Sequence, residues 1–420
     1  MERLVFHVDV NSAFLSWEAA YRIHHLGGTL DLRSIPSAVG GDQEARHGII
    51  LAKSIPSKQF GIQTGESVHE ALQKCPGLYL VPPNYNLYER CSHAFVELLK
   101  EYSPDVEQYS IDECFMDMSG TKWLFPDPIQ TAELIRERIS HELGFTVNIG
   151  ISDNKLLAKM ASDFRKPDRV HTLFKDEMQQ KMWPLPVKNL FYVGRASAGK
   201  LYKLGIYTIG QLAQADPNVL KAHLKSHGLQ IWNFANGIDL SPVQPVMPAN
   251  KGYGNSTTIA FDVQEAETAK NVLLALAETV SARLRKDKVK AEVISIGIRY
   301  ADFQQISHQM TLNHATNITI ELHQYACRLF DEVWNRKPVR HLGIHTARIK
   351  DGGELRQLSF FDLANFEKWE DMDRAVDQIR LKYGIDAVKR AVFIRGSIDH
   401  LSGGVSREKR TVAYDRLVID

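Results

Sequence analysis

Three prolines at a regular spacing, Pro242, Pro245 and Pro248, divide this sequence into two parts with separate patterns of strands and helices. Proline fixes its own φ angle and lacks a backbone donor, so such a run favours an extended linker. A chain of 420 residues also exceeds one ordinary domain, for which roughly 100–200 residues is typical. We therefore expect several folded units, with residues 242–250 as a linker between two of them.

The first part alternates strands with helices. Apolar periodicity predicts strands at 4–9, 48–53 and 145–151, and helices at 13–24, 66–73, 87–101, 129–142 and 155–164. Residues 106–118 carry alternating apolar side chains around a central Ser-Ile-Asp-Glu, which is typical of a hairpin with two acids at its bend. This order favours a ferredoxin-like α+β sandwich.

The residues just before the linker and those after it follow other orders. After a break at Pro184 and Pro186, residues 188–237 are typical of short helices. Beyond the linker, the pattern predicts strand, helix, two strands, helix and strand, at 254–261, 265–286, 289–300, 305–312, 318–334 and 339–349. The sequence therefore predicts a second, βαββαβ domain, with one more helix at 366–383.

The formal net charge of +1 hides a segregation of charge along the chain. Residues 1–120 carry 9 basic and 16 acidic side chains, residues 153–225 carry 13 and 6, and residues 245–350 carry 14 and 10. The nets are −7, +7 and +4, which suits an enzyme that binds metal ions at one place and a polyanion at another. Uneven solvated surface would give the same numbers, so the motifs must decide.

The cysteines and the apolar runs exclude other classes of protein. Cys75, Cys91, Cys114 and Cys327 form no CxxC pair, so neither a zinc ribbon nor a disulfide framework is indicated. Scattered thiols fit a reducing cytosol. No stretch reaches the roughly 18 apolar residues of a membrane span. We expect a soluble, cytoplasmic protein without membrane contact.

Three carboxylates form the candidate catalytic centre. Asp9 ends the first predicted strand, and Asp112 and Glu113 lie at the bend of the hairpin. If the hairpin packs beside that strand, the like charges need a cation, and oxygen ligands select Mg²⁺ or Mn²⁺. Asp112 and Glu113 alone could be ordinary turn residues, but a carboxylate within an apolar strand needs a partner.

At these residues the sequence resembles the Y-family (translesion) DNA polymerases, in their bacterial UmuC-like branch. The motifs that carry the resemblance are residues 9–14 (DVNSAF), 109–115 (YSIDECF) and 148–159 (NIGISDNKLLAK). The resemblance implies a palm at 1–20 and 77–183, fingers at 21–76, a helix-hairpin-helix thumb at 184–241, a linker at 242–250, a little finger at 251–350 and a tail at 351–420.

The resemblance also implies roles for individual residues. Asp9, Asp112 and Glu113 would hold two Mg²⁺ ions, for which Mn²⁺ can substitute, with the backbone carbonyl of Val10 as a further ligand. Phe14 matches the steric gate, a ring that excludes the ribonucleotide 2′-hydroxyl; plain packing at a helix start is the alternative.

Two lysines match positions that contact the nucleotide triphosphate, Lys58 and Lys166. Lysine suits this role as a point charge on a mobile phosphate. The sequence departs from the pattern at Ala52 and Ile55, where many relatives carry a Thr and a Tyr whose hydroxyls would touch the phosphates. Nucleotide binding therefore has to differ from the family's in detail.

Residues 187–212 resemble a helix-hairpin-helix, whose loop would bind a DNA phosphate through backbone N–H groups. The DNA-binding residues implied are Val193, Gly194, Arg195, Lys200 and Lys203. A helical packing turn is the alternative. The cluster Arg283, Arg285, Lys286, Lys288 and Lys290 would lie near the DNA, although charge runs are usually solvated surface.

The tail contains Gln357-Leu358-Ser359-Phe360-Phe361, which resembles the peptide that binds the ring-shaped sliding clamp of bacterial polymerases. Two aromatic side chains and a leucine on an extended segment could fill an apolar pocket. A segment packed on its own domain is the alternative.

The resulting expectation is a template-directed, low-fidelity DNA polymerase without proofreading, which acts as a monomer on primer–template DNA and dNTP. It would transfer a nucleotide to the primer 3′-hydroxyl by a two-metal mechanism. A catalytically silent DNA- and clamp-binding adaptor is the alternative; it would be expected to lack acids of the triad, and all three are present. A cyclic-nucleotide synthase with a similar palm would lack the thumb and little finger.

Overall fold

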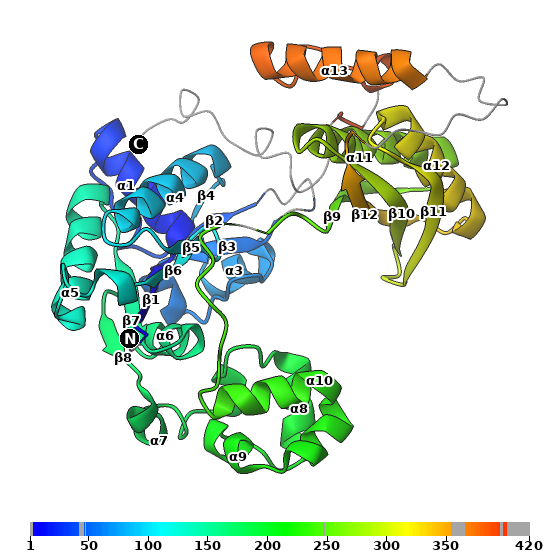
Figure 1. Ribbon diagram of the computed structural model, residues 1–420. Helices are drawn as coiled ribbons and strands as arrows, with labels where there is room; N and C mark the ends of the chain where they lie inside the picture. Colours follow the sequence, from blue (N-terminus) through cyan, green and yellow to red (C-terminus); the bar gives the residue numbers. More distant parts are fainter. Residues whose placement is uncertain are drawn as a thin grey trace. The chain divides into compact units, whose positions relative to one another are not determined.

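The computed structural model describes residues 3–41, 46, 48–246, 248–353, 366–394 and 398–400. The chain forms two compact units (Figure 1). Among the described residues, the first unit contains those up to 246 except 41, 46, 48 and 49, and the second contains these four residues and those from 248 to 400. Each unit has its own hydrophobic core.

A five-stranded sheet forms the centre of the first unit, in the order β5-β6-β1-β7-β8. Its strands are β1 (Val5–Val10), β5 (Val106–Gln108), β6 (Glu113–Asp117), β7 (Val147–Ser152) and β8 (Val170–Thr172). β1 is antiparallel to both β6 and β7, and β7 is parallel to β8. β1 is therefore the central strand, and its last residues lie between two neighbours.

The two faces of this sheet carry different helices. The even-numbered residues of β1 join the core with α1 (Ala13–Leu26), α4 (Tyr85–Lys100) and α5 (Pro128–Arg138). Val5 on the other face contacts α6 (Lys155–Ser162) through Ala158. That helix lies so close that a Cβ on Gly150 of β7 would be 1.9 Å from the Ala158 carbonyl oxygen, so only glycine fits. Because side chains alternate along a strand, His7 and Asp9 point to the α6 side.

Two smaller parts complete the first unit. A three-stranded sheet, in the order β3-β2-β4, is built from β2 (Ser37–Gly40), β3 (Ile50–Lys53) and β4 (Tyr79–Val81), with α2 (Ile55–Gln59) and α3 (Val68–Lys74). A helical part follows the palm: α7 (Met178–Lys181), α8 (Arg195–Lys203), α9 (Ile209–Gln214) and α10 (Pro217–Ala235). Its core includes apolar residues of α6, so the helical part packs directly on the palm.

The second unit is a four-stranded antiparallel sheet, in the order β11-β10-β12-β9, with helices packed against it. Its elements are β9 (Gly252–Val263), α11 (Ala266–Lys286), β10 (Val289–Tyr300), β11 (Gln305–Thr316), α12 (Thr319–Val333) and β12 (Val339–Asp351). Farther along the chain, α13 (Phe366–Tyr383) is bonded to α11 and α12 through buried charged side chains.

The predicted α+β architecture is confirmed, including the ferredoxin-like sheet and the βαββαβ order. The prediction of one α-helix at 129–142 has to be corrected. The α-helix α5 ends at Arg138, and a π-helix continues from Ile139 to Leu143. The short strands β2, β4 and β8 were not predicted. Among the described residues, no helix combines the length and apolarity needed to cross a membrane.

Candidate active site

The turn from β1 into α1 is fixed by a positive φ angle. Ser12 has φ 49°, in the left-handed region, immediately before the helix. Asn11 anchors the turn, because its backbone N–H and its side-chain amide donate to Thr146 at 3.0 and 3.2 Å. Ser16 Oγ donates to the Asn11 carbonyl at 2.6 Å. These hydrogen bonds therefore fix the position of the first turn of α1 relative to the end of β1.

Two of the predicted acids lie on neighbouring strands, and the third lies at the bend beside them. Asp9 in β1 is the register partner of Glu113 in β6, so both side chains leave the same face of the sheet. The Val10 N–H donates to the Asp112 carbonyl at 3.0 Å. Ser110 Oγ donates to the Asp112 carboxylate at 2.6 Å. The predicted hairpin beside the first strand is therefore confirmed, with Asp112 at its bend, whereas Glu113 is the first residue of β6 and does not lie at the bend.

The three carboxylates do not form a closed cluster. Their ligand atoms do not all lie within 4.8 Å of one another. Among the described residues, Asp386, Asp399 and His400 meet that criterion for a metal site. Lys389 already contacts both of those carboxylates, at 2.7 and 4.0 Å. In the acidic site of the palm, lysines likewise provide the positive charge.

Glu113 is held by two basic side chains. Lys159 Nζ donates to Glu113 Oε2 at 2.6 Å, and His7 Nε2 lies 3.4 Å from the same oxygen without good hydrogen-bond geometry. Burial would raise the pKa of Glu113, but His7 and Lys159 outweigh it and lower this pKa to about 2. Burial lowers the pKa of His7 to about 4, so its imidazole is neutral at pH 7. Lys159 therefore carries the compensating charge.

Asp9 is the most deeply buried of the three acids. Its Oδ2 accepts from Lys166 Nζ at 2.8 Å, and the same ammonium pairs with Asp163 at 2.8 Å. Burial nevertheless raises the pKa of Asp9 to about 6, because the attraction of Lys166 does not offset the lost hydration. Burial would lower the pKa of Lys166, but the charges of Asp9 and Asp163 raise it. One lysine therefore leaves the Asp9 carboxylate incompletely compensated.

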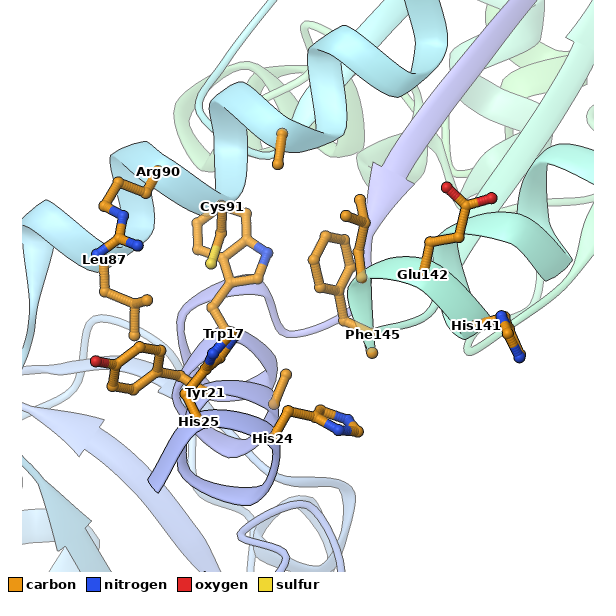
Figure 2. A pocket seen from close by; sticks show the side chains of 14 residues that line it. Trp17, Tyr21, His24, His25, Leu87, Arg90, Cys91, His141, Glu142 and Phe145 are labelled. Atoms are coloured by element: carbon orange, nitrogen blue, oxygen red, sulfur yellow. The ribbon is translucent and has the colours of Figure 1, made fainter. Parts of the chain in front are cut away.

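Phe14 lies in the first turn of α1 as part of an aromatic cluster. Its ring stacks on Tyr88 of α4, with centroids 4.4 Å apart and planes 8° apart. The ring centroids of Tyr85 and Trp17 lie 6.1 and 5.9 Å from the centroid of the Phe14 ring. Trp17 also lines a cavity of about 400 Å³ between α1, α4 and the turn into β7, where it faces Phe145 (Figure 2).

The smaller sheet carries a pair of lysines. Lys58 is exposed on α2, and burial together with the charge of Lys58 lowers the pKa of Lys53. Ala52 is buried in β3, and Ile55 is 48% exposed at the start of α2. The Ser54 hydroxyl caps that helix and bonds to the Ile35 carbonyl at 2.7 Å. Because Ala52 and Ile55 have no hydroxyl groups, Lys53 and Lys58 are the side chains of this segment best suited to bind a phosphate group.

The predicted DNA-binding residues of the helical part lie on one helix and the turn before it. Gly194 is the N-cap of α8, and a Cβ there would meet no atom of the described residues within 4 Å. Arg195, Lys200 and Lys203 are exposed, whereas Val193 is buried in the core of this part. The start of α8 is thus open beside Arg195, whereas Lys200 and Lys203 lie in the last turn of the helix.

One expectation for the second unit has to be corrected. In the basic cluster at 283–290, Arg285 is not free for DNA, because it donates to Asp373 at 3.0 Å and to Asp377 at 2.6 Å. It was misjudged because its partners lie nearly a hundred residues away in the tail. The predicted clamp peptide at 357–361 lies outside the described residues.

Lys159 and His7 were not assigned roles from the sequence, although each left a signal. Lys159 is the one charged residue in the continuous buried run from Leu156 to Ser162 of α6. His7 lies two residues before Asp9 in an apolar strand, so the strand period places both on one face. A charged or titratable side chain at a position that the periodicity buries marks a buried polar network.

These features define a class of protein: a five-stranded sheet with acids at one edge, a helical part and a βαββαβ domain occur together in the fold of a Y-family DNA polymerase. The impB/mucB/samB family model matches residues 8–163, and the model of the family's C-terminal domain matches residues 250–360. A solved Y-family DNA polymerase chimera of Dbh and Dpo4 shares the fold, with a TM-score of 0.73 at 21% identity, over 83% of this chain and 99% of the chimera.

Curated relatives give a narrower assignment. The chain is 44% identical to DNA polymerase IV of Clostridium acetobutylicum, over 94% of this chain and 99% of the relative. It is 37% identical to DNA polymerase IV 1 of Bacillus subtilis, over 94% of each chain. The chain belongs to the DNA polymerase IV family, and it is a DNA-directed DNA polymerase of the translesion type.

Proposed function

We propose that this polymerase transfers nucleotides by a two-metal mechanism on Asp9, Asp112 and Glu113, with the Val10 carbonyl as a further ligand. The observation that carries the proposal is the pairing of Asp9 with Glu113 across β1 and β6, beside the bend that holds Asp112. It brings three carboxylate side chains to one edge of the sheet.

The residues fit divalent cations of the hard type. All the donors are oxygen atoms, which Mg²⁺ prefers and Mn²⁺ accepts. The raised pKa of the buried Asp9 carboxyl supports this, because it reflects a charge that Lys166 does not fully compensate. Two bound ions would supply activation of the primer 3′-hydroxyl and charge stabilisation for the departing pyrophosphate.

The chain's own cations would complete the nucleotide site. Lys166 bridges Asp9 and Asp163 through a single ammonium group, so it can exchange a carboxylate partner for a triphosphate oxygen. Lys58, with Lys53 beside it, would bind the triphosphate from the fingers in place of the hydroxyl groups that Ala52 and Ile55 lack. Lys159 would stay on Glu113 and orient it.

Phe14 would act as the steric gate, and the α8 helix would bind the DNA backbone. The gate requires a ring in a fixed place, which agrees with the close stack on Tyr88. The open helix start at Gly194, with Arg195 beside it, suits a phosphate contact that does not depend on sequence, and the exposed Lys200 and Lys203 in the last turn would contact the backbone farther along the DNA.

Primer extension with Mg²⁺ tests the metal site. The double variant Asp112→Ala/Glu113→Ala should lose at least about a thousandfold in the rate of nucleotide addition, because the transition-state charge loses its cations. Asp105→Ala, an exposed acid at the start of the same hairpin, is the matched control and should retain activity. Equal extension by the double variant and the wild type would refute the proposal.

A further inference from the structure

We propose that Tyr88, held by Glu18, is a positioning residue for sugar selection, because it fixes the ring of the steric gate. The inference rests on the proposed role of Phe14. Exclusion of the ribonucleotide 2′-hydroxyl depends on the position of the Phe14 ring. A residue that holds this ring in place therefore contributes to the selection of deoxyribose over ribose. Tyr88 would not touch the nucleotide; it would act through Phe14.

The ring geometry supports this role. Phe14 and Tyr88 are stacked nearly parallel, at 4.4 Å and 8°, which is the closest ring contact that Phe14 makes among the described residues. Tyr88 is fully buried, whereas Phe14 is only partly buried. A buried ring pressed against the face of an exposed one limits both its rotation and its displacement.

The hydroxyl group of Tyr88 makes a hydrogen bond inside the core, where packing alone would be met by a phenylalanine ring. It donates to Glu18 Oε1 at 3.0 Å, and Glu18 is a carboxylate with 1% exposure. Glu18 Oε2 lies 3.7 Å from Arg22 Nε, so the charge of this carboxylate is compensated within α1 while its Oε1 accepts the Tyr88 hydroxyl. Phe14 and Glu18 are four residues apart on one face of α1, so Tyr88 contacts two successive turns of that helix.

The same helix face is tied to the catalytic hairpin. Ser92, one turn beyond Tyr88 on α4, donates to the carbonyl of Ile111, the residue before Asp112. Gln108 of β5 donates to the Ser92 hydroxyl at 2.9 Å. One face of α4 therefore contacts both the ring of Phe14 and the backbone immediately before Asp112, so a single helix would relate the gate to the metal site.

Free space beside the cluster makes this support necessary. Trp17, which contacts both Phe14 and Tyr88, lines the cavity shown in Figure 2, together with Leu87 of α4. Rings next to a cavity can shift when a neighbour is removed, because the surroundings do not restore the packing. Loss of the Tyr88 ring should therefore let Phe14 move away from the sugar.

Single-nucleotide insertion with dNTP and with the matching ribonucleotide tests the inference. Tyr88→Leu removes the stacking ring and should lower the ratio of kcat/KM for the two sugars by roughly tenfold or more. Tyr88→Phe keeps the ring and should lose less than about threefold, and Glu18→Gln should behave similarly. Phe95→Leu, equally buried on α4, is the control for general loosening of the core and should leave the ratio unchanged.

Phe14→Ala separates the two proposals. If it raises ribonucleotide insertion while folded Tyr88→Leu keeps the wild-type ratio, the gate stands and the role of Tyr88 is refuted. If Phe14→Ala leaves sugar selection unchanged, the gate itself fails. If Tyr88→Leu does not fold, Tyr88→Met, which also removes the ring but keeps more of its volume, replaces it, and an unchanged ratio there overturns the inference. A loss of selectivity in Phe95→Leu as large as in Tyr88→Leu would also overturn it, since loosening of the core would then suffice.

Discussion

At the scale of single residues, the site shows a conflict between stability and function at Asp9. The folded protein raises the pKa of this carboxyl from 3.8 to about 6, so its charged form is less stable in the native state than in the unfolded chain. Below about pH 4 the group is neutral in both states. The destabilisation therefore develops as pH rises from about 4 to about 6 and is complete above that.

Asp9→Asn should accordingly stabilise the metal-free protein. The gain in the free energy of unfolding should reach roughly 2–3 kcal/mol at pH 8 and be smaller at pH 5. Thermal unfolding in EDTA at the two pH values measures it, with Asp105→Asn as the exposed control. Mg²⁺ should raise the Tm of the wild type more than that of the variant. A variant that is less stable than the wild type at pH 8 would contradict this reading.

At the scale of elements, the sequence predicted the long and periodic ones best. α13 (Phe366–Tyr383) and β10 (Val289–Tyr300) have the predicted bounds, because their lengths allow several apolar repeats. β2, β4 and β8 were missed since three or four residues hold too few repeats, and neighbouring strands rather than local preference stabilise them. The acids of the site were predicted, but the ion pairs of Lys159 with Glu113 and of Lys166 with Asp9 join segments far apart in the sequence, which no local pattern encodes.

α13 caps another helix from a distance. Asp373 accepts from the backbone N–H of Thr319, the first residue of α12, at 2.7 Å, and the preceding Ile318 has an apolar side chain that cannot accept this bond. Asp373→Ala removes this cap, worth about 1–2 kcal/mol, together with the buried ion pair to Arg285, so the total loss of stability should exceed that of a cap alone. Faster hydrogen exchange at Thr319 would show it. Asp371→Ala, in an exposed ion pair with Arg374, should have little effect, and equal effects of the two changes would refute the cap.

At the scale of the whole molecule, the near-neutral charge is the sum of an acidic catalytic part and basic parts that follow it. Such a distribution suits binding of metal ions and of a polyanion in separate places, but it provides weak overall attraction to DNA. A polymerase with few favourable charges has to be retained on its template by other contacts. The clamp-like peptide at 357–361 is a candidate for that role.

Gln357→Ala/Phe360→Ala should then weaken binding to a purified bacterial sliding clamp, because the apolar anchor and its hydrogen-bonding neighbour are both removed. Extension of a primer without the clamp should stay at the wild-type rate, since neither residue belongs to the palm. The clamp should stimulate the wild type and not the variant on long templates. Ser359→Ala, within the same segment, is the matched control. Equal clamp affinity of wild type and double variant would show that retention on DNA depends on other residues.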